Sequence, residues 1–149
     1  MEIERKFIPL ELPFSLSDFP FHEIEQAYLL MSPVVRIRKE DDTYYLTVKG
    51  PGGLSHEELN LPLSLDAYRR LLPKCEGILL RKRRYLIPLR DLTVELDVFA
   101  APYEGLRIAE VEFPSVEDAM TFEKPLWFGA EVTDDPHYQN ASLALGINP

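Results

Sequence analysis

The chain has 149 residues, 46% hydrophobic and 28% charged, which suits one globular domain over residues 1–149 with a sizeable core. Its net charge of -9 argues against a general nucleic-acid-binding protein, whose binding surface is basic, but not against a small anionic ligand. The single cysteine, Cys75, excludes an internal disulfide framework, and no apolar run approaches the roughly 18 residues of a membrane span. The N-terminus lacks the apolar core of a secretory signal, so we expect a cytoplasmic protein without a membrane partner.

Short alternating segments separated by turn residues follow one another along most of the chain. Gly, Pro and Asp mark turns at residues 41–42, 50–53, 90–91 and 102–105. The strands are predicted at Glu2–Ile8, Glu25–Leu30, Val34–Lys39, Thr43–Lys49, Ser55–Leu61, Leu79–Ile87, Thr93–Phe99 and Leu106–Phe113. This succession is typical of a β-rich barrel or sandwich.

Two short helices and an irregular tail complete the prediction. Ser64 is expected to cap a helix that ends near Leu72, and Ser115 to cap a second one with acidic residues in its first turn. After Gly129 we expect irregular structure with a short helical turn near Asn140–Leu145. The fold class is therefore β-rich α+β.

Charged residues stand two apart on six of the predicted strands, and such residues point to the same face of a strand. The first strand carries Glu2 and Glu4 followed by Lys6. The other pairs are Arg36/Arg38, Thr47/Lys49, Lys82/Arg84, Glu95/Asp97 and Glu110/Glu112, where the Thr47 member is a hydroxyl. The residues between them are mostly apolar, and Arg5 and Arg83 break this rule.

Any one of these pairs alone is better explained as a solvated strand face, but six of them together favour another arrangement. We expect eight antiparallel strands to close into a barrel, with the charged faces inside and the apolar faces covered outside by helices and loops. The interior cations would be Lys6, Arg36, Arg38, Lys49, Lys82 and Arg84. The interior acids would be Glu2, Glu4, Glu58, Glu95, Asp97, Glu110 and Glu112.

Buried charges without partners are costly, so such an interior must be wet or filled. A polyanion would pair with the Arg and Lys side chains. Hard divalent cations would pair with the carboxylates, and an all-oxygen ligand set favours Mg²⁺ or Mn²⁺. A divalent metal together with a polyphosphate satisfies both sets of charges.

In this order, the Glu-x-Glu-x-Lys start and the five following pairs resemble the CYTH superfamily, the triphosphate tunnel metalloenzymes. The resemblance runs from residue 2 to about residue 143, and residues 131–138 are similar to the short bacterial members. It implies an eight-stranded antiparallel tunnel that binds a triphosphate and two divalent ions. His56 and His137 depart from it, because Arg is common there in relatives.

The resemblance also implies roles for individual residues. Phosphate and substrate contacts fall to Lys6, Arg36, Arg38, Lys49, Glu58, Lys82 and Arg84. Metal ligands are expected among Glu2, Glu4, Asp97, Glu110 and Glu112. The catalytic set is Lys6, Glu95, Asp97 and Glu110, of which the acids would hold or orient the second metal and the attacking water. The histidines lack metal-ligand spacing, so we expect surface or turn roles for His22, His56 and His137.

The leading hypothesis is Mg²⁺- or Mn²⁺-dependent hydrolysis of a triphosphate, with inorganic triphosphate as the first choice and two ions at work. The sequence has no Ser/His/Asp cluster and no P-loop. The alternatives are a class IV adenylate cyclase, a thiamine or nucleoside triphosphatase, and a non-catalytic polyphosphate-binding module. Trp127, Phe128 and Tyr138 are expected to pack within the tail rather than stack on a base. A homodimer is left open.

Overall fold

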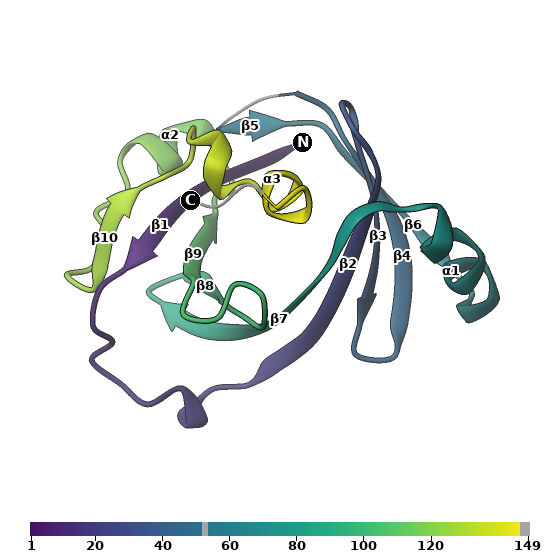
Figure 1. Cartoon of the computed structure of the whole chain (residues 1–149). Coiled ribbons are helices and arrows are strands. Elements are labelled where there is room, and N and C mark those ends of the chain that lie inside the picture. The colour runs from purple at the N-terminus through teal and green to yellow at the C-terminus, as the bar shows by residue number, and fades with distance from the viewer. Residues whose placement is uncertain (52–53, 147–149) are drawn as a thin grey trace.

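A ten-stranded antiparallel sheet curls into a barrel in the computed structural model, which describes residues 1–51 and 54–146 (Figure 1). The strands are β1 (Glu2–Pro9), β2 (Phe21–Met31), β3 (Val34–Glu40), β4 (Thr43–Lys49), β5 (Ser55–His56), β6 (Glu58–Leu63), β7 (Glu76–Leu89), β8 (Leu92–Phe99), β9 (Arg107–Glu112) and β10 (Phe128–Glu131). Neighbours follow the order β10-β1-β9-β8-β7-β2-β3-β4-β6, and β5 pairs with β1. The predicted antiparallel barrel is confirmed.

The strand count differs from eight because β1 shares one of its edges between two partners. Near its start Glu2 pairs with His56 of β5, and near its end Phe7 pairs with Glu131 of β10. Only Glu57 separates β5 from β6, which pairs with β4, so β5 and β6 together bridge β4 and β1. The single strand expected at residues 55–61 is therefore broken into two.

The expectation of irregular structure after Gly129 was wrong for its first residues. β10 extends to Glu131 because the second half of β1 offers a free edge for backbone hydrogen bonds. The expected strands were also too short at β2 and β7, which run over 11 and 14 residues. Of the turn expected at residues 50–53, Gly52 and Gly53 lie outside the described residues.

The helices are η1 (Leu16–Asp18), α1 (Leu65–Leu71), η2 (Leu72–Lys74), α2 (Val116–Met120), η3 (Pro136–Tyr138) and α3 (Asn140–Ala144). Of these, α1 and α2 lie outside the ring of strands, as predicted (Figure 1). Ser64 and Ser115 cap α1 and α2 as expected, each hydroxyl accepting a backbone hydrogen bond of 3.0 Å. Ala119 of α2 is buried in a core with Phe7 and Val111, so the apolar faces of β1 and β9 pack outward.

The last helix, α3, lies inside the ring of strands (Figure 1). Leu143 and Ala144 are fully buried against Tyr28, Leu80 and other apolar residues of the barrel wall. This position of the predicted helical turn did not follow from the sequence. It closes part of the interior with an apolar cluster and leaves the charged side chains around the remaining space. Among the described residues, no helix has the length and apolar character needed to span a membrane.

Candidate active site

The inward faces of the strands gather the predicted charged residues around one cavity. Every predicted site residue except Asp97 lines it, namely Glu2, Glu4, Lys6, Arg36, Arg38, Lys49, Glu58, Lys82, Arg84, Glu95, Glu110 and Glu112. Arg5 and Arg83, which broke the pattern, lie on the outside and pair at 2.6 Å with Glu131 and Glu23. The two-residue spacing therefore separated the inside of the barrel from the outside.

Acids and cations occupy different parts of the barrel wall. β1, β9 and β8 are neighbours, and their registers place Glu4 opposite Glu112 and Glu95 opposite Glu110. Like charges directly opposite each other destabilise a sheet unless something neutralises them. The cations stand mainly on β3, β4 and β7, while Lys6 stands among the acids. We call the cavity-lining acids of β1, β8 and β9 the acidic wall; they are Glu2, Glu4, Glu95, Glu110 and Glu112. We call the cavity-lining cations of β3, β4 and β7 the basic wall; they are Arg36, Arg38, Lys49, Lys82 and Arg84.

The acidic wall holds carboxyl groups that resist ionisation. Burial and a hydrogen bond with Glu58 raise the pKa of Glu2 from 4.5 to about 8, although Lys49 opposes this. Burial and the charge of Glu110 raise the pKa of Glu4 from 4.5 to about 7. A divalent cation would replace these protons and remove the repulsion.

Glu110 behaves differently because it has cationic partners. Its carboxylate lies 3.7 Å from Nζ of Lys6 and 4.0 Å from Nη2 of Arg84. Burial alone would raise its pKa, but these two cations outweigh burial and lower it to about 2. Glu110 is therefore a charged acid at neutral pH.

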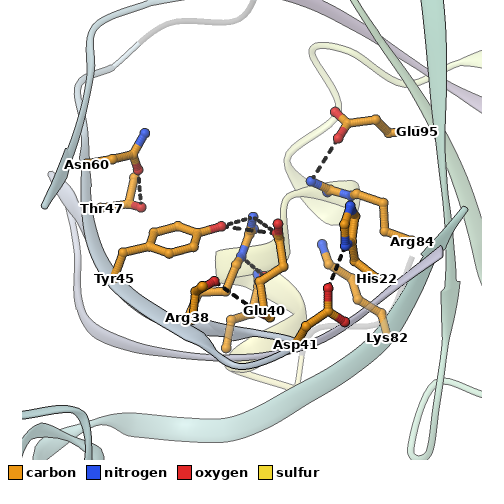
Figure 2. Close-up of polar contacts among 12 residues, drawn as sticks. His22, Arg38, Glu40, Asp41, Tyr45, Thr47, Asn60, Lys82, Arg84 and Glu95 are labelled. Carbon is orange, nitrogen blue, oxygen red and sulfur yellow. Dashed lines mark hydrogen bonds and ion pairs between the residues drawn. The ribbon is translucent and has the colours of Figure 1, made fainter. Parts of the chain in front are cut away.

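The basic wall presents guanidinium groups that are only partly satisfied by the protein. Arg38 donates hydrogen bonds of 3.0 Å to Gln26 and 3.1 Å to Tyr45, and Figure 2 shows it facing Arg84 across the interior. Burial, with the nearby charges of Arg36 and Arg84, lowers its pKa. Arg36 donates from Nη2 to Thr47 at 3.2 Å, and its buried Nε has no partner among the described residues. Such a donor is costly to leave unpaired, so an anion fits here.

Asp97 lies behind the cavity rather than at its surface. One of its oxygens accepts from Nε of Arg84 at 2.8 Å, and the other from Nη2 at 3.0 Å and from Nζ of Lys82 at 2.7 Å. Burial would raise its pKa, but both cations outweigh burial and hold it well below its usual value. With both oxygens engaged, this geometry favours Asp97 as the residue that orients the two cations and does not favour the predicted metal ligation.

Lys82 is the most enclosed cation of the site. Its side chain is 1% exposed, and it also donates to Oδ1 of Asn140 at 3.0 Å. Burial lowers its pKa from 10.5 to about 7, even though Asp97 opposes this change. An arriving anion would strengthen the charged form of this ammonium group.

Several neutral residues of the site were not predicted from the sequence. Gln139 and Asn140 line the cavity from the tail, and Oε1 of Gln139 lies 3.4 Å from Nζ of Lys6. No strand spacing marks them, because Gln139 directly precedes α3 and Asn140 is its first residue. Gln26 and Tyr28 also point inward from β2 and are hydrogen-bonded at 3.0 Å. Their two-residue spacing is a neutral version of the charged pairs and was the available signal.

The expected surface role of His56 was wrong. Pairing of β5 with β1 buries His56, and its Nε2 lies 2.9 Å from Oε1 of Glu2. The other two histidines agree with the expectation. His22 is partly exposed beside Asp41, and His137 is exposed in a turn capped by Asp135.

The sequence of this chain is similar to a known protein family and to characterised proteins. The CYTH domain model matches residues 1–132. The chain is 40% identical to an inorganic triphosphatase of Nitrosomonas europaea over 98% of both chains. It is 36% identical to an inorganic triphosphatase of Acetivibrio thermocellus over 95% of this chain and 92% of the relative.

Solved structures of similar fold include members of the same group of proteins. A crystal structure of an inorganic triphosphatase covers 100% of this chain and 97% of its own, with 35% identity and a TM-score of 0.73. A putative adenylate cyclase of Bacillus halodurans covers 80% of this chain and 84% of its own at 19% identity and a TM-score of 0.64, a likeness of fold alone. The matched family model and the full-length relatives show that the chain belongs to the CYTH domain family.

Proposed function

We propose that the protein hydrolyses the terminal phosphoryl group of inorganic triphosphate with Mg²⁺ or Mn²⁺ as cofactor. The observation that carries this proposal is an acidic wall and a basic wall around one cavity. Each wall alone holds charges that the protein does not fully neutralise, and a metal–triphosphate complex neutralises both. The names of the two inorganic triphosphatases among the relatives support the same activity.

The carboxylates of the acidic wall fit a pair of hard divalent ions. Glu2, Glu4 and Glu112 would hold one ion, while Glu95 and Glu110 would hold or orient the second and the attacking water. The raised pKa values of Glu2 and Glu4 indicate oxygen donors that are poorly neutralised by the protein itself. When bound, Mg²⁺ or Mn²⁺ would polarise the phosphoryl oxygens and lower the pKa of a coordinated water.

The cations bind and orient the triphosphate. Arg36, Arg38 and Lys49 would contact phosphate oxygens from one side, with Arg36 and Arg38 able to donate in pairs. Arg84 and Lys82, held by Asp97, would neutralise charge that develops on the transferred group. Lys6 stands beside Glu110 and would bridge the substrate and the metal ligands, whereas Glu58 would meet the substrate at the edge of β6.

The placement of the aromatic rings favours inorganic triphosphate over a triphosphate that carries a base. Phe128 is 2% exposed and packs with Trp127 in the outer core, and Tyr138 packs beside α3. The tail aromatics are therefore used for packing, as predicted. Tyr28 lines the cavity and Tyr45 lines the adjoining pocket, and both hydroxyl groups accept hydrogen bonds within the protein, from Gln26 and Arg38 respectively.

A phosphate-release panel tests the proposal. Inorganic triphosphate, thiamine triphosphate, ATP and long polyphosphate are each incubated with Mg²⁺ or Mn²⁺. We expect the fastest metal-dependent release from inorganic triphosphate. Formation of cyclic AMP from ATP at a comparable rate would instead identify a class IV adenylate cyclase. Faster phosphate release from thiamine triphosphate or ATP than from inorganic triphosphate would identify a thiamine or nucleoside triphosphatase.

A polyphosphate-binding module without catalysis is the proposal of another class. Glu4→Ala and Glu112→Ala separate it from the enzyme, because these changes remove metal ligands and leave the basic wall intact. Loss of hydrolysis with retained triphosphate affinity supports the enzyme. Absence of metal-dependent phosphate release from every triphosphate in the wild type would establish the module. Homodimer formation and a cytoplasmic location stay predictions.

A further inference from the structure

A nitrogen donor stands beside two carboxylates where β5 meets β1. His56 pairs with Glu2 across the strands, and Glu58 follows two residues later at the start of β6. One ligand atom from each of the three residues lies within 4.8 Å of the other two. Two ligands that share one ion at about 2.0–2.2 Å are at most about 4.4 Å apart, so small side-chain adjustments suffice.

The backbone holds these three residues in place. The Glu2–His56 and Ile3–Ser55 pairs join β1 to β5, and the amide of Glu4 donates to the carbonyl of Leu54 at 3.0 Å. His56 is 8% exposed, which limits the freedom of its ring. A site carried by paired strands loses little conformational freedom when an ion binds.

The charges around the cluster also suit a cation. Glu2 and Glu58 both contribute carboxyl groups and share a hydrogen bond. Nζ of Lys49 lies 3.7 Å from Oε1 of Glu2. A divalent ion bound between the two carboxylates would take the place of the hydrogen that they share.

We propose that Glu2, His56 and Glu58 form a mixed nitrogen–oxygen site that binds Zn²⁺ in preference to Mg²⁺ and Mn²⁺. Imidazole is a good ligand for Zn²⁺, whereas Mg²⁺ and Mn²⁺ suit oxygen ligands. One His with two carboxylates supplies three protein ligands and leaves a fourth position for water. The site shares Glu2 with the proposed hydrolytic ions, but it rests on the geometry of the ligand cluster and not on hydrolysis.

Calorimetric titration of the metal-free protein with Zn²⁺ and, separately, with Mg²⁺ tests the site. His56→Asn should weaken Zn²⁺ binding at least about tenfold, because even outer-shell partners of metal ligands contribute about 10–100-fold. Mg²⁺ affinity should change by less than about twofold, because Mg²⁺ disfavours a nitrogen ligand. His137→Asn is the matched control, since His137 is exposed and paired with Asp135, and it should bind Zn²⁺ like the wild type.

Pulsed EPR of the Cu²⁺-loaded protein gives a readout that does not depend on a stable variant, because Cu²⁺ is paramagnetic and, like Zn²⁺, binds imidazole well. We expect ¹⁴N modulation from an imidazole ligand in the wild type and in His137→Asn, and its loss in His56→Asn. Equal Zn²⁺ affinities of wild type and His56→Asn, or no ¹⁴N modulation in the wild type, would overturn the site. Phosphate release from inorganic triphosphate with Mg²⁺, measured on the same samples, tests the proposed function separately.

Discussion

At the scale of one residue, Glu4 shows how a carboxylate proposed to bind metal destabilises the metal-free fold. Its side chain is 12% exposed, and burial together with the charge of Glu110 raises its pKa to about 7. Without metal and above that pH the carboxylate is charged and poorly neutralised. We expect Glu4→Gln to stabilise the metal-free protein at pH 8.5 by about 1–3 kcal/mol, the usual penalty for an unsatisfied buried group. At this size that is roughly 2–4 °C in Tm per kcal/mol, measured by calorimetry.

The same change should remove function. Glu4→Gln takes away a proposed metal ligand, so metal-dependent phosphate release should fall at least about a hundredfold. Glu112→Gln is the control, because Glu112 is exposed; it should reduce hydrolysis but alter Tm by less. A Glu4→Gln protein that is less stable than wild type without metal would contradict this account of the acidic wall.

The titration of Glu2 and Glu4 predicts the pH dependence of metal binding. Their folded-state pKa values of about 8 and about 7 lie above the unfolded value of 4.5. Protonation therefore favours the metal-free fold at low pH, and that stability is lost as pH rises from about 4.5 to 8. Metal binding must displace these protons, so Mg²⁺ affinity should rise between pH 6 and 8 and then level off.

Calorimetry in buffers of different ionisation enthalpy measures both quantities. Proton release per bound Mg²⁺ should be large at pH 6.5 and small at pH 9, and Glu4→Gln should release fewer protons at pH 6.5. An affinity for Mg²⁺ that is unchanged from pH 6 to pH 9 would rule out protonated carboxyl groups at the metal ligands.

Individual residues also show what the sequence could reveal about the site. Strand periodicity alone separated Lys82 and Arg84, which face the cavity, from Arg83, which faces outward. It could not separate Asp97 from Glu95, because the difference between a residue that orients cations and one that lines the cavity depends on side-chain direction. It also could not place His56, whose burial depends on which strand β5 joins.

At the scale of elements, the least predictable feature is α3. Its five residues have no distinctive periodicity, and its place inside the barrel depends on apolar contacts with strands far away in sequence. The break between β5 and β6 and the pairing of β10 depend on the same kind of information. Pairing partners are long-range properties, whereas strand faces and helix caps are local, which explains why the latter were predicted.

Gly77 offers a test of how α3 is held. It has a φ of +74°, and a Cβ there would overlap the carbonyl oxygen of Ala144 in α3. Gly105 has a φ of +90°, but a Cβ there meets no described heavy atom within 4 Å. Gly105→Ala should therefore cost only backbone strain, about 1–2 kcal/mol. Gly77→Ala should cost that amount plus about 1–3 kcal/mol of overpacking.

Urea unfolding of both variants gives the comparison. We expect Gly77→Ala to lose more stability than Gly105→Ala and also to weaken triphosphate binding, because displaced α3 would carry Asn140 away from Lys82. Equal losses in the two variants would show that α3 is not seated against residue 77.

In the whole molecule, the charged residues on the outside of the barrel differ from those inside it in how they are paired. The exterior carries ion pairs such as Arg83 with Glu23, whose side chains are 44% and 57% exposed, and exposed pairs contribute little to stability. The interior carries charges that have fewer protein partners and depend on ligands. A net charge of -9 thus coexists with a strongly basic wall, which is why the overall charge did not exclude an anionic substrate.

Ligand-induced stabilisation should therefore depend on the interior cations and not on the exterior ones. A non-hydrolysable imido analogue of triphosphate, added with Mg²⁺ at about 100 times its Kd, should stabilise the wild type by about 2.7 kcal/mol. Arg36→Gln removes a buried guanidinium whose Nε lacks a partner among the described residues. This variant should lose most of the ligand-induced Tm shift at the same concentration, because a lower affinity reduces the stabilisation.

Arg83→Gln is the matched control for that experiment, because it removes the same charge from the outer face of the barrel. Its Tm shift with the analogue should equal that of the wild type, and its Tm without ligand should change by less than about 1 kcal/mol in equivalent stability. Equal loss of the shift in both variants would mean that the analogue responds to the total charge of the protein. A loss confined to Arg36→Gln places the triphosphate against the basic wall, where Nε of Arg36 has no hydrogen-bond partner among the described residues and can donate to an anion.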